Sequence, residues 1–319
     1  MKVLSVGHAL VDYFIFGNDE TPALQGLHLG SFNHLPQDRM HGVVTKLGGS
    51  SPMAGGSAAN VVKLAAQLGL ETMFAGKCGP DELGEIFKQE MHAAGVKCIL
   101  QEGKSPTGIC ITYLSAGRRT IATARSAAGE ITPELIKEIL LNDVSVILVE
   151  GYLLFNREVL YHILRKAQEA KIKVAFDPGN LILIDDFREE ILVLVENFVD
   201  YLFINEEEAL SLTGMDLETS LTFLGNKCEC LALKRGEKGS IVVHQGKKYP
   251  IHSIGPSIMD PTGAGDGYTA GFLYGLAHFS HPDEWGKSGA LVAGEVISVP
   301  GSRLEKGQIK RLKTALESL

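Results

Sequence analysis

Short, fully apolar segments alternate with amphipathic segments along most of this chain. The apolar segments have the length of strands and lack polar alternation, which is typical of strands covered on both faces. The amphipathic segments are long enough for the covering helices, so the alternation predicts an α/β fold with a mostly parallel sheet. The predicted strands are Val3–Val6, Met73–Lys77, Val146–Val149, Val174–Phe176, Tyr201–Ile204 and Leu231–Leu233, and the predicted helices are Ala58–Leu68, Glu82–Ala94, Arg157–Ala170 and Phe187–Phe198.

Two regions interrupt this rhythm. The stretch from Asp12 to Leu47 has no convincing helix pattern, and the stretch from Thr107 to Thr123 has the pattern of a hairpin. We expect them to form a small β-sheet lid, with lid segments at 12–47 and 98–123, because ligands of parallel sheets bind beyond the carboxyl ends of the strands. The alternative is a long surface loop and an ordinary hairpin. The length of 319 residues fits a single α/β domain over 1–319.

The charge balance and the cysteines limit the classes of function. A net charge of −8 argues against nonspecific nucleic-acid binding and against an anionic membrane surface. The first residues form too short an apolar run for a signal peptide, and no stretch is long enough to span a membrane. The odd number of cysteines predicts reduced thiols and a cytoplasmic protein, with Cys228 and Cys230 as buried strand thiols rather than a metal pair.

A glycine-rich run from Asp260 to Asp266 precedes a helical stretch from Gly267 to His278. Gly263 and Gly265 flank Ala264, so several backbone N–H groups can converge at the positive end of a helix dipole, where phosphate binds. Asp266 stands in the same turn and could accept the proton of an attacking hydroxyl. Phosphoryl transfer needs both features. The alternative is an ordinary turn in which Asp266 complements the helix N-terminus.

The amino-terminal part of the chain supplies candidate groups for an acceptor. Asp12 follows the first predicted strand, and its carboxylate could accept hydrogen bonds from two sugar hydroxyls. Gly55 and Gly56 permit close approach of a ligand, and the Asn60 amide can both donate and accept hydrogen bonds. The alternatives are a solvated loop aspartate and a plain helix start capped by Ser57.

Two further strand ends carry candidate groups. Asn205 and Glu208 are three residues apart, so both could face one site from a first helical turn and hold magnesium through oxygen atoms and water. Asn205 could instead be a helix cap. After the strand that ends at Leu233, Lys234 could reach a phosphate and Gly236 could admit a nucleotide to the backbone. The alternative there is a hairpin turn into Ser240–Val243.

In this order the motifs resemble those of the ribokinase-like carbohydrate kinases, also called the PfkB family, over nearly the whole chain. The 260–266 run is similar to the family's C-terminal motif, Gly55–Gly56 with Asn60 to its N-terminal motif, and Asn205 with Glu208 to its Asn-x-x-Glu element. The resemblance implies a doubly wound sheet with a β-lid. It also implies ATP- and magnesium-dependent transfer of the γ-phosphoryl group to a primary hydroxyl of a sugar or nucleoside.

The resemblance also implies a role for each motif residue. Asp266 would be the catalytic base, and the N–H groups of Gly263, Ala264, Gly265 and Asp266 the anion hole. Asp12, Gly56 and Asn60 would hold the acceptor, Asn205 and Glu208 hydrated Mg²⁺, and Lys234 and Gly236 the ATP. Some members bind K⁺ near the anion hole. In this chain the corresponding positions are Asp260, Thr262 and the backbone around Val296, Val299 and Gly301. Two departures are Lys234, in the position of the family's Thr, and Pro261, which replaces a common Thr and stiffens the loop.

The acceptor stays open between a nucleoside and a free sugar. The segments 118–120, 126–132, 150–153 and 293–298 resemble bacterial members labelled adenosine-kinase-like, and Tyr13, Phe14 and Phe16 could cover a base. Equally, Arg118 or Arg119 could bind a sugar acid or sugar phosphate.

Two other classes of function compete with the kinase. One is a sensor of the same fold without turnover, and the other is a nicotinamide-dependent oxidoreductase. Tyr268 at the third glycine position of a dinucleotide fingerprint disfavours the oxidoreductase. Exposed edge strands of the lid could pair two copies of the chain in a homodimer, although the sequence does not fix the oligomeric state.

Overall fold

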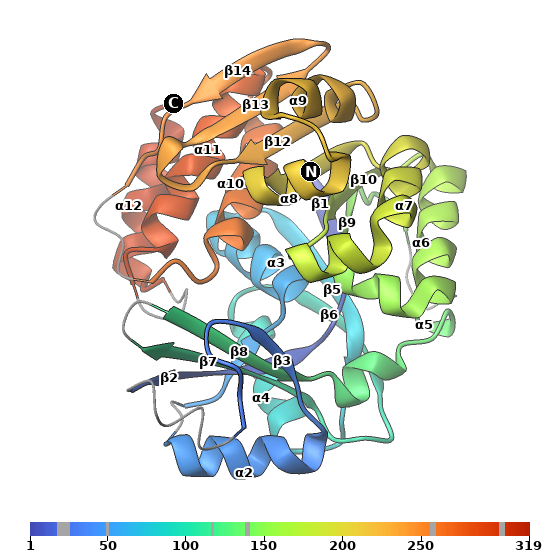
Figure 1. Cartoon of the computed structure of the whole chain (residues 1–319), viewed down its shortest axis with the longest axis vertical. Helices are drawn as coiled ribbons and strands as arrows, with labels where there is room; N and C mark the ends of the chain where they lie inside the picture. Colours follow the sequence, from blue (N-terminus) through green and yellow to red (C-terminus); the bar gives the residue numbers. More distant parts are fainter. Residues whose placement is uncertain (18–25, 49–50, 116–117, 138–140, 256–259, 300–303) are drawn as a thin grey trace.

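The computed structural model describes residues 1–17, 26–48, 51–115, 118–137, 141–255, 260–299 and 304–319. Within them the fold is α/β, with one large and one small sheet (Figure 1). The large sheet is parallel except for the last two strands, which form an antiparallel extension at one edge. Its order is β14 (Lys247–Ile251), β13 (Ser240–His244), β12 (Cys230–Lys234), β11 (Tyr201–Asn205), β10 (Lys173–Asp177), β9 (Val146–Glu150), β1 (Lys2–Val6), β5 (Glu71–Cys78) and β6 (Lys97–Glu102).

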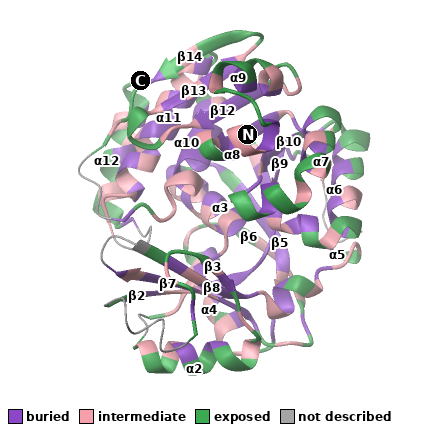
Figure 2. Ribbon diagram, viewed as in Figure 1, coloured by how far each residue is buried: buried purple, intermediate pink, exposed green. Residues whose placement is uncertain are grey.

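Both faces of the large sheet are covered by helices, as the apolar strands predict. Val3 and Leu4 are neighbours in β1, yet they belong to two different hydrophobic cores because successive strand residues point to opposite faces. Figure 2 shows the buried residues concentrated in these strands and on the inner helix faces. One core includes α3 (Ser57–Leu68), α4 (Glu82–Ala93), α10 (Ala264–His278), α11 (Pro282–Val296) and α12 (Lys306–Glu317), and the other α6 (Arg157–Ala170), α7 (Leu181–Asn197), α8 (Glu206–Thr213) and α9 (Leu217–Gly225).

The small sheet contains the predicted hairpin. Its order is β3 (Phe32–His34), β8 (Arg118–Ala124), β7 (Gly108–Ser115), β2 (Leu10–Phe16) and β4 (Met53–Gly55), and β7 with β8 is antiparallel. The predicted lid boundaries need correction, because β6 belongs to the large sheet and β4 lies outside both predicted segments.

The expectation of no helix between Asp12 and Leu47 is wrong. Helix α2 (Gln37–Leu47) covers the face of the small sheet that is turned away from the large one (Figure 1). Met40 and Val43 are its buried residues, and they join a third core with Ile109 and Ile111 of β7. Two buried residues in a mostly polar helix leave a weak periodic signal, and contact with the sheet stabilises it. The lid-edge homodimer stays a prediction.

Three local expectations also differ from the structure. Asp12 lies inside β2 rather than in a loop, because the chain re-enters a strand three residues after β1. Helix α7 begins at Leu181 rather than Phe187, where non-helical dihedrals (φ −126°, ψ 23°) break the periodicity. Cys230 is buried in β12 as predicted, whereas Cys228 precedes that strand and is only partly buried.

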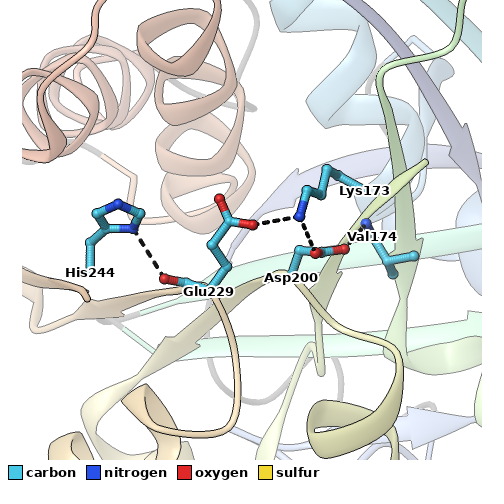
Figure 3. Close-up of polar contacts among 5 residues, drawn as sticks. All are labelled: Lys173, Val174, Asp200, Glu229 and His244. Atoms are coloured by element: carbon cyan, nitrogen blue, oxygen red, sulfur yellow. Dashed lines mark hydrogen bonds and ion pairs between the residues drawn. The ribbon is translucent and has the colours of Figure 1, made fainter. Parts of the chain in front are cut away.

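Charged residues join the strands at the amino-terminal edge of the large sheet (Figure 3). The Lys173 ammonium lies 2.8 Å from Asp200 and 2.6 Å from Glu229, and Asp200 accepts the N–H of Val174 at 2.8 Å. His244 Nδ1 lies 3.1 Å from the Glu229 carbonyl oxygen. These contacts lie far from the carboxyl ends of the strands, so this edge is structural. Among the described helices, none is long and apolar enough to cross a membrane.

Candidate active site

The carboxyl ends of the central strands carry polar side chains that face the small sheet. Strands β9, β10, β11 and β12 end at Glu150, Asp177, Asn205 and Lys234. Glu150 pairs in register with Asp177, and Asn205 pairs with Lys234, so the four side chains form a row along one edge. Between this row and the small sheet lies a pocket of about 420 Å³. It is lined by, among others, Asp12, Gly56, Asn60, Asn205, Glu208, Lys234, Gly236, Thr262, Gly263, Ala264, Gly265 and Asp266.

The glycine run opens helix α10 as expected. Gly263 caps the helix with φ +75°, a left-handed conformation that glycine adopts without a steric penalty. The Ala264 N–H donates to the Pro261 carbonyl at 3.2 Å. The N–H groups of Gly265 and Asp266 meet no backbone acceptor in the part of the chain that the structure describes. These two donors are therefore available to an anion in the pocket.

The Asp266 carboxylate points across to helix α3. Its Oδ1 accepts a hydrogen bond from Ser57 Oγ at 2.7 Å, and its Oδ2 accepts one from Asn60 Nδ2 at 3.3 Å. Burial raises the pKa of Asp266 to about 7, while the two hydrogen bonds and Lys234 act in the opposite direction. A carboxyl group with this pKa can exchange a proton near neutral pH. The sequence indicated Ser57 only as a helix cap. That expectation is wrong, because Gly56 is the N-cap, no side-chain hydrogen bond caps α3, and Ser57 Oγ donates to Asp266 instead.

The wall of the pocket at the small sheet is formed by close backbone packing around Asp12. A Cβ atom on Gly55 would lie 2.0 Å from the Asp12 Cγ atom, and one on Gly56 would lie 2.3 Å from the His8 carbonyl oxygen. Gly56 also has φ +95°, so both its conformation and its surroundings require glycine. Burial raises the pKa of Asp12 to about 7, partly offset by Lys63. With this pKa, the Asp12 carboxyl gains or loses its proton near neutral pH.

A buried pair that was not predicted from the sequence fixes the start of α3. Glu150 Oε1 accepts the backbone N–H of His8 at 2.7 Å and lies 2.5 Å from His8 Nδ1. Its Oε2 accepts the backbone N–H of Ala58 at 3.1 Å. Glu150 thus joins the β1–β2 connection to the helix that holds Asp266. It is the last residue of a buried strand, and that position was the available signal.

Lys234 lies among the carboxylates of Asp177, Glu208 and Asp266. Its ammonium is 2.7 Å from Asp177 Oδ2, and a Cβ atom on Gly265 would lie 3.4 Å from it. Burial opposes its charge, but Asp177 and Glu208 outweigh burial and raise the pKa of Lys234. A lysine at this position therefore stays protonated beside the glycine run. Asp177 was also missed, although it too ends a buried strand.

Asn205 and Glu208 form a capping box at the start of α8. Asn205 Oδ1 accepts the Glu208 N–H at 2.8 Å, and Glu208 Oε2 accepts the Asn205 N–H at 2.9 Å. The cap is present, and Glu208 Oε1 keeps no hydrogen-bond partner among the described residues. Burial and the neighbouring Asp177 raise the pKa of Glu208. Within the described ranges, no three His, Cys, Asp or Glu side chains converge to hold a metal ion unaided.

A second pocket of about 490 Å³ adjoins the first across the glycine run. The two pockets share Lys234, Gly236, Pro261, Ala264 and Gly265. The second pocket is mostly apolar, as is typical of a site that binds a flat ring. Its lining includes Tyr268, Ile254, Ala293 and Ile297. The expected turn into β13 is present as a short 3-10 helix, η3 (Gly236–Lys238).

The aromatic side chains on the first pocket are not the predicted ones. Tyr13, Phe14 and Phe16 do not line it, because Tyr13 faces the α2 side of the small sheet and Phe16 is 62% exposed at the strand end. Phe32 and Tyr152 line it instead, with ring centroids 6.2 Å apart and an interplanar angle of 27°.

The residues expected for potassium lie behind the glycine run. Asp260 is buried, and its Oδ1 accepts the Thr262 N–H at 2.9 Å. The Asp260 N–H donates to the Ile297 carbonyl at 3.2 Å, which brings this loop to the end of α11, near Val296 and Val299. Gly301 lies outside the described residues.

A helix start with two available N–H groups and a carboxyl of raised pKa lie between two adjoining pockets, an arrangement that suits a phosphotransferase with an alcohol acceptor. The family model described as "pfkB family carbohydrate kinase" matches residues 36–306, and the chain belongs to this family. It is a kinase of sugars or nucleosides.

Named relatives include both kinds of kinase. A ribokinase from Arabidopsis thaliana is 28% identical over 78% of this chain and 68% of its own length. The crystal structure of an adenosine kinase from Sinorhizobium meliloti has a TM-score of 0.91 and 29% identity, over 98% of this chain and 99% of its own. That of a probable sugar kinase from Rhizobium etli has the same TM-score and identity, over 98% of both chains.

Proposed function

We propose that the protein transfers the γ-phosphoryl group of MgATP to a primary hydroxyl of a small polyhydroxylated acceptor. The observation that carries the proposal is the Asp266 carboxylate, held by Ser57 and Asn60 between two pockets that share the glycine run. The apolar pocket suits the adenine and ribose of ATP, and the pocket under the small sheet suits the acceptor. The two substrates then meet at the start of α10.

The chain supplies one group for each requirement of the reaction. Asp12 and Asn60 bind acceptor hydroxyls, and Gly56 allows the acceptor to approach the backbone. Asp266 accepts the proton of the attacking hydroxyl as the new O–P bond forms and the bond to ADP breaks. The N–H groups of Gly265 and Asp266, with those of Gly263 and Ala264, bind the oxygens of the transferring group. The Ala264 N–H leaves the Pro261 carbonyl to take part.

Lys234 adds a positive charge to this anion site. Its ammonium lies beside the glycine run and is held there by Asp177. A phosphoryl group entering the run adds negative charge near this ammonium, which compensates the charge that develops during transfer. The same position can be filled by Thr in the family, so Lys234 gives this chain a charged alternative to a hydroxyl donor.

Metal ions have fitting but incomplete protein sites. Glu208 Oε1 and the Asn205 side chain can hold Mg²⁺ through water, and the missing ligands would come from the phosphates. Bound Mg²⁺ neutralises phosphate charge. A bound K⁺ ion would be held by oxygen atoms around Asp260, Thr262, Val296 and Val299.

Both acceptor classes have support. The Phe32–Tyr152 pair could stack on a nucleobase, in keeping with the relative from Sinorhizobium meliloti that is called an adenosine kinase. The carboxylates and amide around Asp12 and Asn60 suit sugar hydroxyls equally well, in keeping with the ribokinase relative.

The test is ADP release from MgATP with a panel of nucleosides, pentoses, hexoses and sugar acids, in the presence and absence of K⁺. We expect acceptor-dependent release by the wild type and its loss in Asp266→Asn. Acceptor-dependent release that Asp266→Asn retains would refute the base assignment. Acceptor binding without ADP release would favour a sensor of the same fold.

A further inference from the structure

Two arginines lie on one wall of the acceptor pocket. Arg119 of β8 and Arg125, which follows the last residue of that strand, both line it. His34 of the neighbouring β3 also lines it, and burial and Arg125 lower its pKa, which favours the neutral imidazole. The arginines lie on one face because alternate residues of a strand point the same way. Ile121 and Thr123 lie between the two arginines on that face, so this wall carries no carboxylate between them.

Neither arginine has an anionic partner among the described residues. The half-buried Arg125 guanidinium lies over the Phe155 ring, with its Cζ atom 4.2 Å from the ring centroid. Among the described residues it has no other ring contact and no ion pair. Other arginines of this chain are ion-paired, for example Arg157 with Glu190 at 2.8 Å and Arg235 with Glu206 at 2.8 Å. A partly buried guanidinium without a counter-ion is costly. Burial accordingly lowers the pKa of Arg125.

The carboxylates of the pocket come from other elements. Asp266, Asp177 and Asp12 line the pocket near the position proposed for the reacting hydroxyl, and Asp177 pairs with Lys234 rather than with either arginine. In the small sheet, Leu10 of β2 pairs with Gly108, and a Cβ atom on Gly108 would lie 2.4 Å from the Arg125 carbonyl oxygen. Arg125 is thus two strands, about 10 Å, across the sheet from the strand of Asp12. A molecule the size of a hexose spans this gap when the arginine extends toward it.

We propose that the acceptor is anionic: a polyhydroxylated compound with a carboxylate or a phosphate ester that pairs with Arg125 and Arg119. The inference rests on the proposed function and names its substrate class. The planar guanidinium binds either group through two hydrogen bonds. Pairing with Arg125 and Arg119 then orients the acceptor, with its anion at these arginines and its primary hydroxyl at Asp266.

The first test measures binding by calorimetry in the presence of MgADP. Each anionic probe is compared with a neutral partner: a hexonate with the matching hexitol, and a hexulose 1-phosphate with the free hexulose. Adenosine is the neutral nucleoside probe. We expect one anionic probe to bind at least about tenfold more tightly than its neutral partner. The pair that shows the difference identifies the anion as carboxylate or phosphate.

The second test uses variants of the arginine wall. Arg125→Met should weaken binding of the anionic probe by about 10- to 100-fold and change neutral probes less than twofold. Arg125→Lys should keep part of the preference. Arg157→Met is the matched control, because Arg157 also lies over an aromatic ring (5.3 Å from the centroid of Phe187) but does not line the pocket. Thermal melting of each variant monitors folding, and Arg119→Met gives an independent measurement if Arg125→Met unfolds.

The outcomes separate this inference from the proposed function. If no anionic probe binds more tightly than its neutral partner, or if Arg125→Met weakens both equally, the inference is wrong. If adenosine binds best and the arginine variants bind it normally, the acceptor is a neutral nucleoside. If an anionic probe binds through Arg125 but releases no ADP from MgATP, the inference stands and the proposed phosphoryl transfer fails.

Discussion

Asp266→Asn tests the site and its electrostatics together. The substitution removes the proton acceptor but can keep both contacts to α3. The Ser57 hydroxyl can accept from the new amide N–H₂, and the amide oxygen can accept from Asn60. We therefore expect a folded protein whose kcat is lowered by about 10²- to 10⁴-fold, the usual contribution of a general base. The wild-type kcat/KM, which reports groups of the free enzyme, should rise with pH through about 7, the pKa of Asp266 before substrates bind.

The same substitution should stabilise the ligand-free protein at alkaline pH. The Asp266 pKa rises from 3.8 to about 7 on folding, and each unit corresponds to about 1.4 kcal/mol. Because the carboxyl is partly open to solvent, we discount the resulting 4 kcal/mol to about 2 kcal/mol, or about 3 °C in Tm. Between pH 4 and 7 the folded wild type binds more protons than the unfolded chain, so its stability falls as pH rises. The advantage of Asp266→Asn should therefore grow across this window and stay constant above it.

The measurements are coupled ADP release and denaturant unfolding at several pH values from 4.5 to 8.5. Asp38→Asn, an exposed aspartate in the first turn of α2, is the control and should change neither quantity. Near-normal turnover in Asp266→Asn would refute the role of the base. A variant that is less stable than the wild type at pH 8 would refute the argument from burial.

Three further substitutions test other contacts. Ser57→Ala removes a hydrogen bond that favours the charged form of Asp266, so the midpoint of the pH profile of kcat/KM should move up by about one unit, and an unchanged midpoint would exclude this role. Gly56→Ala places a Cβ atom 2.3 Å from the His8 carbonyl at φ +95° and should cost about 2 kcal/mol or more of unfolding free energy, measured by urea denaturation. Lys173→Met, at a side chain 47% exposed, should cost less than about 1 kcal/mol and leave ADP release unchanged, and slower turnover would show that this edge is not purely structural.

Much of the fold follows from local patterns. The apolar strands and amphipathic helices predict the layers of the large sheet because burial on two faces leaves a signal within each segment. Helix α2 escaped prediction because its burial depends on a sheet formed by distant segments. The aromatic residues of the pocket were mispredicted for the same reason, because they are brought there by packing between distant segments. Phe32 and Tyr152 line the pocket, in place of the expected Tyr13, Phe14 and Phe16.

The site could be predicted where chemistry and backbone are local. The glycine run with Asp266, and the strand ends at Asn205 and Lys234, are visible in sequence because glycine and position after a buried strand carry the signal. Glu150 and Asp177 end strands in the same way and could have been found by that rule. The roles of the predicted site residues stay predictions until the variants are measured.

The sequence by itself determined the layered α/β architecture and the family, because both are written in short segments whose residues act together. Only the tertiary structure decided which side chains meet. Ser57 and Asp266 are 209 residues apart, and Lys234 meets Asp177 across 57 residues. Arg125 faces the pocket without a carboxylate partner among the described residues because of strand register. Such contacts, and the pKa values that burial produces, depend on packing between distant segments, which no local pattern of residues encodes.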